Sequence, residues 1–401
     1  MMFFVRILEK STSSQKTLAK EEEEREMITS IATTTSGAFA AAQRRRQHSI
    51  EKKKTTKRRV SSSSSTSSGG VFAFASSSSN SSDDDDDEKK RSDVGVQNGK
   101  TKKKTCVITG ANTGIGYETA LAMLQKDYKV IAAVRDVKKM ELARESLMEK
   151  LKGTEDVEIV IEAMDLSDTK SIEAFAKKFM DSDDALDVLI NNAGVMATPE
   201  MKTKDNFEYQ IGVNHLGHYK LTNMVLPKLL ESGSSSGDAR IVNVSSEAHR
   251  FGKLEKNDLF YEKAGSYNNW KSYGQSKLAN ILFANELQRK LEREKDVKYV
   301  SCNSLHPGAV NTELGRYLYD ADKKPGFFEE MIFNVIRTTM KTPAQGAETS
   351  VYLASDPTAS RFRGKYFDNC KEKVSTNAAR NEDDARWLWQ RSAELTGVDF
   401  F

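Results

Sequence analysis

The chain has 401 residues, 61 of them basic and 58 acidic, and its formal net charge of +3 gives no reason to expect nucleic acid as a partner. Its three cysteines, Cys106, Cys302 and Cys370, lie far apart and show no metal-ligand spacing, which excludes a disulfide framework and favours a reduced compartment. The histidines are equally scattered, so no metal site is expected. No apolar run reaches the roughly 18 residues that a membrane-spanning helix needs.

Residues 1–100 differ in composition from the rest of the chain. They contain serine runs, basic clusters and acidic runs, and such a segment buries too little apolar surface to offset its ordering entropy. We therefore expect a disordered leader, followed by one folded domain over residues 101–401. Residues 29–75 are typical of an organelle transit peptide, which predicts a chloroplast or a mitochondrion. The acidic run 21–24 leaves a solvated tail on a cytoplasmic or membrane-surface protein as the alternative.

A glycine-rich turn follows the first expected strand. Residues 105–108 are typical of a buried strand, and residues 117–124 have the apolar spacing of a helix. Glycines between them can make a tight turn, admit a pyrophosphate and let the helix pack closely, while the helix N-terminus faces the phosphates. A purely structural turn is the alternative, and the motifs that follow favour the dinucleotide site. Its expected residues are Gly110, Asn112, Thr113, Gly114, Ile115 and Gly116.

The second expected strand ends without an acidic side chain. NAD-preferring folds place an acid there to accept hydrogen bonds from the adenosine ribose. Here Val134 is followed by Arg135, which with Lys138 or Lys139 offers positive charge to a 2′-phosphate. NADP(H) is therefore the expected cofactor. Asp136 keeps a ribose contact open as the alternative.

Strand and helix patterns then alternate along the chain. Residues 140–151 are expected to form a helix, 157–161 a strand, 171–179 a helix and 186–190 a strand. Four rounds of this alternation predict an α/β fold, a Rossmann-type doubly wound parallel sheet in a single domain. Polar or small residues after the last two strands are expected to contact the cofactor, namely Asp165, Asn192, Ala193 and Gly194.

A serine pair and a Tyr/Lys pair carry the expected chemistry. The expected strand 240–244 ends in Ser245 and Ser246, and Tyr273 opens a helix on which Lys277 lies one turn later. A phenol with a pKa near 10 is a poor acid or base at neutral pH, but a neighbouring ammonium lowers that pKa. The Tyr/Lys spacing alone is common in helices with no catalytic role, so it indicates an active site only in combination with the nucleotide motifs.

Together these motifs resemble the short-chain dehydrogenase/reductase superfamily over about residues 102–397. Within it, the chain is most similar to the retinol dehydrogenase-like branch, which includes a chloroplast-envelope type. The superfamily motifs are 109–116, 191–194, Asn214, Ser245-Ser246, 273–277 and Pro307-Gly308. The finer similarity is carried by 110–116, 214–218, 245–249, 276–280 and the tail 384–397.

The resemblance implies a role for each matching residue. Tyr273 would be the acid/base, and Lys277 would tune its pKa and anchor the nicotinamide ribose. Ser246 would orient the carbonyl, with Ser245 as the neighbouring alternative. Asn214 would hold a water behind the lysine as the relay residue. The cofactor would also contact Arg135, Asp165, Asn192, Pro307, Gly308 and Thr312, the last of these at the carboxamide.

The implied activity is NADP(H)-dependent hydride transfer to or from a hydrophobic aldehyde, ketone or alcohol. Residues 326–336 are dense in large apolar side chains, as expected of a substrate lid or a peripheral membrane contact. A helix that caps the core or a subunit contact is the alternative for this segment. The resemblance leaves a homodimer or a membrane-bound monomer open.

Two further functions remain as alternatives. Light-dependent protochlorophyllide reductase shares the nucleotide half and the Tyr/Lys pair, but this chain has Ala309 where that enzyme carries a cysteine, and it lacks the longer insertion before the tyrosine. The other is an NADP(H)-binding redox-sensing component of a chloroplast-envelope assembly. An intact Ser/Tyr/Lys set favours an enzyme over a sensor.

Overall fold

A computed structural model describes residues 102–294, 299–310 and 340–401 of the chain. The expected leader, Thr312 and the apolar segment 326–336 lie outside the described residues. Among the helices that are described, none combines the length and the apolar character needed to cross a bilayer.

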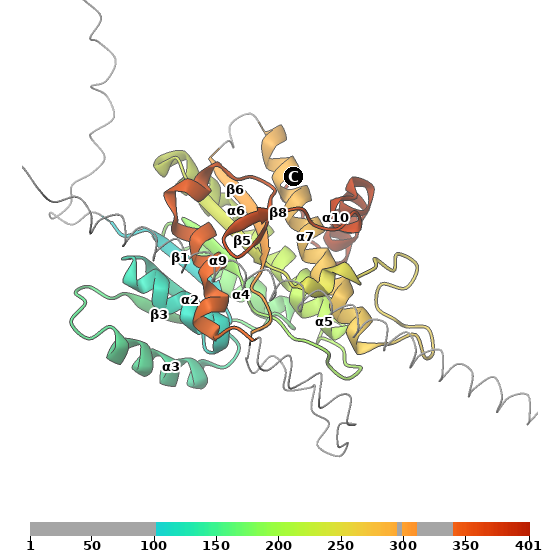
Figure 1. Ribbon diagram of the computed structural model, residues 1–401, viewed down its shortest axis with the longest axis horizontal. Coiled ribbons are helices and arrows are strands. Elements are labelled where there is room, and N and C mark those ends of the chain that lie inside the picture. The colour runs from blue at the N-terminus through green and yellow to red at the C-terminus, as the bar shows by residue number, and fades with distance from the viewer. Residues whose placement is uncertain (1–101, 295–298, 311–339) are drawn as a thin grey trace, which may run out of the picture. The chain divides into compact units, whose positions relative to one another are not determined.

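The described strands form one sheet in the order β3-β2-β1-β4-β5-β6-β7-β8 (Figure 1). Every neighbouring pair is parallel except β7 and β8, which are antiparallel. The strand order reverses between β1 and β4, which is where open α/β sheets bind their ligands. The predicted doubly wound sheet is confirmed. Its strands are β1 Thr105–Thr109, β2 Lys129–Val134, β3 Ile159–Ala163, β4 Val188–Asn191, β5 Ala239–Val244, β6 Val300–His306, β7 Tyr366–Asp368 and β8 Lys371–Lys373.

Helices cover both faces of the sheet because alternate strand residues point in opposite directions. Val107 of β1 belongs to the core under α4, α6 and α7, whereas its neighbours Cys106 and Ile108 belong to the core under α2, α3 and α9. Both cores are almost wholly apolar, so the sheet is buried on each side, as parallel sheets are. The longer helices are α2 Gly114–Gln125, α3 Val137–Lys150, α4 Thr169–Met180, α6 Gly217–Ser236, α7 Asn269–Arg293, α9 Pro343–Ser355 and α10 Glu382–Thr396.

Short helical turns link these elements. The turn that matters most for the site is η1 (Gly212–Leu216), a π-helix between the short α5 (Tyr209–Ile211) and α6. The sequence predicts an ordinary helix here. A π turn widens the helix by one residue, and such turns are frequent at functional sites. The remaining turns are the 3-10 helices η2 Glu247–Arg250, η4 Pro357–Arg361 and η5 Ala378–Arg380.

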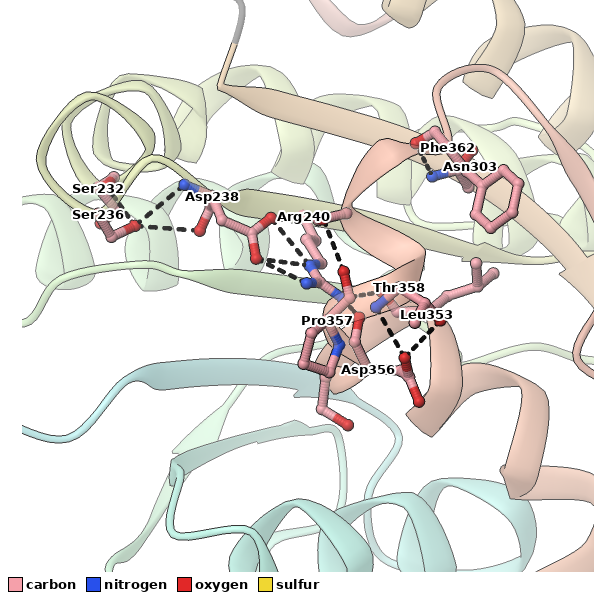
Figure 2. Close-up of polar contacts among 12 residues, drawn as sticks. Ser232, Ser236, Asp238, Arg240, Asn303, Leu353, Asp356, Pro357, Thr358 and Phe362 are labelled. Atoms are coloured by element: carbon pink, nitrogen blue, oxygen red, sulfur yellow. Dashed lines mark hydrogen bonds and ion pairs between the residues drawn. The ribbon is translucent and has the colours of Figure 1, made fainter. Parts of the chain in front are cut away.

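The buried Arg240 links the start of β5 to the end of α9 through hydrogen bonds (Figure 2). The Arg240 guanidinium donates to both carboxylate oxygens of Asp238 at 2.6–3.0 Å. It also donates to the carbonyls of Leu353 and Asp356, at 3.1 and 2.8 Å. The last carbonyls of a helix have no hydrogen-bond partner within the helix, and Arg240 donates to carbonyls at the C-terminal end of α9. The Asp238 carboxylate in turn balances the charge of the buried guanidinium.

Candidate active site

The glycine turn lies at the carboxyl end of β1, beside the strand reversal. Gly110 and Gly114 have φ of +67° and +56°, a backbone region that favours glycine. A side chain on Gly110 would lie 3.0 Å from the Ala193 Cβ, and one on Gly116 would overlap the Gly110 carbonyl. The turn therefore needs all three glycines.

The first turn of α2 is open toward this edge of the sheet. Thr113 precedes the helix, and within the described chain its side chain makes no capping hydrogen bond. The first N–H groups of the helix can therefore serve a ligand, and the helix dipole favours an anion there. Asn112, Thr113 and Ile115 are half-buried in the same turn. The geometry fits a dinucleotide pyrophosphate.

Thr109, which sequence reasoning did not select, joins the glycine turn to the end of β4. Its Oγ1 accepts hydrogen bonds from the backbone N–H groups of Asn192 and Ala193, both at 2.9 Å. The Asn192 amide in turn donates to the Thr109 carbonyl at 2.8 Å. The expected carboxamide link between neighbouring strands is thus present. Its only indication in the sequence was a hydroxyl residue at the end of β1.

At the adenosine end, Asp136, the alternative ribose contact, and Asp165, an expected cofactor contact, both accept hydrogen bonds within the protein. Asp136 caps α3, with its carboxylate accepting from the Lys139 N–H at 3.0 Å. Asp165 accepts from the N–H and hydroxyl of Ser167 at 2.9 and 2.7 Å. Arg135 is exposed at the end of β2, and its guanidinium donates to the Tyr209 hydroxyl at 3.1 Å. This arrangement presents positive charge at the place where a 2′-phosphate would lie.

The Tyr/Lys pair lies on α7, facing the ends of β5 and β6. Tyr273 and Lys277 are both only 3% exposed, and the Tyr273 hydroxyl is hydrogen-bonded to Ser246. The Lys277 ammonium lies 5.8 Å from the centre of the Tyr273 ring and donates to the Val244 carbonyl at 3.2 Å. Ser245 is engaged elsewhere, because its hydroxyl donates to the Lys277 carbonyl at 2.6 Å. Of the two serines, Ser246 is therefore the one beside the phenol.

The electrostatics of this pair correct one expectation. The sequence predicts that Lys277 lowers the pKa of Tyr273, but burial raises that pKa to about 12, against a smaller lowering by the Ser246 hydrogen bond. Burial also lowers the pKa of Lys277 to about 8. Desolvation disfavours the charged form of each group, which raises the pKa of the phenol and lowers that of the ammonium. Tyr273 is therefore protonated at neutral pH and able to donate.

Asn214 lies in η1 and ties this region together. Its amide accepts from the Val195 N–H at 2.8 Å, donates to the Val195 carbonyl at 2.9 Å and donates to the Ser276 hydroxyl at 2.9 Å. A Cβ added to Gly194 would lie 3.2 Å from the Asn214 Oδ1 and 3.4 Å from the Lys277 Nζ. The expected relay residue, the lysine and the end of β4 thus meet at one place.

The Pro307-Gly308 turn follows β6 on the same side. Gly308 has a φ of +89°, and its N–H donates to the Nδ1 of His306 at 3.0 Å. The Nε2 of His306 lies 3.3 Å from Glu247 and 3.2 Å from Asp368. His306, which the sequence did not single out, therefore links this turn to the η2 turn that follows Ser246. The structure brings the selected residues to one sheet edge, Thr312 excepted because it is outside the described residues.

Comparisons with known proteins agree with this geometry. Residues 104–323 match the family model described as short chain dehydrogenase. Retinol dehydrogenase 11 of Homo sapiens is 44% identical over 295 residues, which cover 74% of this chain and 86% of the relative. Retinol dehydrogenase 14 of Homo sapiens is 40% identical over 317 residues, covering 76% and 89%. The crystal structure of an uncharacterised protein from Mycobacterium paratuberculosis has a TM-score of 0.57 and 34% identity, covering 74% of this chain and 95% of its own.

Proposed function

The chain belongs to the short chain dehydrogenase family, and from that premise we propose an NADP(H)-dependent oxidoreductase of the retinol dehydrogenase type. It interconverts a carbonyl and an alcohol on a hydrophobic small molecule. The observation that carries the proposal is the buried, protonated Tyr273, hydrogen-bonded to Ser246 beside Lys277 at the dinucleotide edge of the sheet.

The protein's own residues divide the work of carbonyl reduction. Ser246 and Tyr273 both present hydroxyl groups to the substrate oxygen, so they orient the carbonyl and polarise it. Tyr273 then donates its proton to that oxygen as the alcohol forms. When bound, NADPH supplies the hydride. Lys277 stabilises the resulting phenolate and also binds the nicotinamide ribose, while Asn214 holds the Val195 backbone beside it.

We propose the cofactor contacts on the basis of the residues at the glycine turn and at the end of β2. The glycine turn and the N-terminus of α2 bind the pyrophosphate, and Arg135 pairs with the 2′-phosphate. Asp165 would contact the adenine, and the segment from Asn192 to Gly194 would line the nicotinamide side together with Pro307 and Gly308. The Asp136 carboxylate would serve the alternative by accepting from the ribose hydroxyls, but one of its oxygens already accepts from the Lys139 N–H that it caps.

An NADPH-oxidation screen of the full chain tests the proposal. Candidate substrates are retinal, medium-chain aldehydes, quinones and protochlorophyllide, the last in darkness and in light. We expect turnover of a hydrophobic aldehyde in the dark. A strict light requirement would support the protochlorophyllide alternative. Binding of NADPH without turnover of any carbonyl would support the redox-sensing alternative.

We extend the proposal to the location of the protein. In this proposal residues 1–100 act as an organelle leader, with the chloroplast as the first destination to test and the mitochondrion as the alternative. Fluorescent fusions of the full chain and of a chain that starts at residue 101 test this address, because only the first should enter an organelle. Sedimentation and vesicle flotation of the same proteins distinguish a homodimer from a monomer with a peripheral membrane contact, the two states that the family resemblance leaves open.

A further inference from the structure

His218 is a buried residue that the proposed mechanism does not use. It is the second residue of α6, only 2% exposed, and its two ring nitrogens reach opposite sides of the site. Nδ1 lies 3.0 Å from the Asn214 carbonyl oxygen, and Nε2 lies 2.9 Å from the Thr109 Oγ1. The ring therefore stands between the end of β1 and the π turn.

These partners assign the tautomer of the ring. The Asn214 carbonyl can only accept, so Nδ1 carries the proton and Nε2 accepts from the Thr109 hydroxyl. Thr109 then keeps its oxygen lone pairs for the N–H groups of Asn192 and Ala193. Burial lowers the pKa of His218 to about 4, so the ring is neutral at physiological pH. The Nδ1 proton and the Thr109 hydroxyl proton thus complete the hydrogen bonds on the two sides of the ring.

The link continues on the far side of Asn214. The Asn214 amide donates to the Ser276 hydroxyl, which donates to the Tyr273 carbonyl at 2.8 Å. The same amide clamps both backbone groups of Val195. Residues 192–195 are thus held at one end by Thr109 and at the other by Asn214, and His218 joins the two clamps.

The geometry points to His218 as a positioning residue that couples the cofactor segment 192–195 to Asn214 and the helix that carries Tyr273. This inference rests on the proposed function, since it assigns His218 a part in the same site. Without the ring, the Thr109 hydroxyl and the Asn214 carbonyl each lose a buried partner, and the segment beside Lys277 is free to shift.

Two substitutions of His218 remove different numbers of its hydrogen bonds. His218→Phe keeps the ring volume and removes both nitrogens, whereas His218→Asn retains an amide N–H near the position of Nδ1. We expect His218→Phe to weaken NADPH binding about tenfold and to lower kcat about tenfold. His218→Asn should change each quantity only about threefold, because its amide N–H restores one of the two hydrogen bonds. NADPH affinity is measured by fluorescence titration, and kcat is measured per folded molecule with circular dichroism as the check.

His215 supplies the matched control. It is also fully buried in η1, but its Nε2 bonds to the Ser392 hydroxyl of α10 at 2.8 Å, away from the cofactor segment. His215→Phe and His215→Asn should lower the Tm and leave kcat and NADPH affinity within about twofold of the parent. If His218→Phe does not fold, the comparison of His218→Asn with His215→Asn carries the test.

Three outcomes would overturn the inference. The first is a kcat and an NADPH affinity in His218→Phe that equal those of the parent. The second is the same loss of kcat and affinity in His218→Phe and His218→Asn. The third is a loss in the His215 variants as large as that in the His218 variants. The NADPH titration measures the effect of His218 on cofactor affinity even if the protein reduces no carbonyl. A failure of the proposed function can therefore be distinguished from a failure of this inference.

Discussion

Tyr273 and Ser246 share a hydrogen bond across the active-site edge, although they come from a helix and a turn that are separate in the chain. Ser246 is half-buried, and its own oxygen also accepts from the Ala248 N–H at 3.2 Å, which fixes the hydroxyl at the start of η2. The phenol therefore points to a hydroxyl that the backbone holds in place. A carbonyl oxygen bound between these two groups would meet two donors.

The two neighbouring serines should respond differently to substitution. Ser246→Ala removes one of the two donors and should lower kcat about 100-fold with little change in NADPH affinity. Ser245→Ala removes a buried hydrogen bond to the Lys277 carbonyl, so it should lower the free energy of unfolding by about 1 kcal/mol and affect kcat much less. Steady-state kinetics and urea unfolding of both variants measure this split. A larger kcat loss in Ser245→Ala would reverse the assignment.

Cofactor choice should depend on Arg135. Arg135→Ala removes the charge that we propose for the 2′-phosphate, so NADPH should bind about 10- to 100-fold more weakly, while NADH binding stays within about threefold. Isothermal titration with both cofactors measures the ratio. Arg144→Ala, an exposed arginine of α3 paired with Glu141, is the control and should change neither affinity. Equal weakening for NADPH and NADH would contradict the role.

Lys277 should make the stability of the cofactor-free protein depend on pH. Its pKa is lowered to about 8, below its value in the unfolded chain, so the unfolded state binds more protons between about pH 8 and 10.5. Stability should therefore rise with pH through this window, by about 3 kcal/mol in all. Lys277→Met should be more stable than the parent at pH 7, with a difference that shrinks toward pH 10. Urea unfolding at several pH values tests this, and a difference independent of pH would contradict it.

The Arg240 contacts should matter for stability and not for chemistry. Arg240→Ala leaves the half-buried Asp238 carboxylate and the carbonyls at the end of α9 without their partner, so the free energy of unfolding should fall by about 3 kcal/mol. Arg391→Ala breaks an exposed pair with Glu394 and should cost less than about 0.5 kcal/mol. Both variants should keep the parental KM for NADPH. Denaturant unfolding and initial-rate kinetics provide these values.

Local patterns predicted the nucleotide half well. The glycine turn, the β2 strand and the helical spacing of Tyr273 and Lys277 depend on neighbours in sequence, so they could be read from it. Boundaries were less accurate. The third strand was expected over 157–161 and forms over Ile159–Ala163. The α3 helix begins before the expected 140 because Asp136 caps it.

The features that the sequence did not predict depend on contacts between residues that are far apart in the chain. The hydrogen bond between Thr109 and His218 joins residues 109 positions apart, and no local pattern indicates it. The π turn at Asn214 looks like ordinary helix in sequence because both use the same residue types. The raised pKa of Tyr273 could not be predicted either, since the spacing shows the nearby lysine and not the burial that raises the pKa.

Substitution of Tyr273 tests the central claim most directly. Tyr273→Phe keeps the buried ring and removes only the hydroxyl group that we propose donates the proton, so the full chain should bind NADPH with parental affinity. Its kcat with the best hydrophobic aldehyde should fall by about 100-fold or more. Turnover within about tenfold of the parent, with NADPH still bound, would show that another group supplies the proton and would contradict the account.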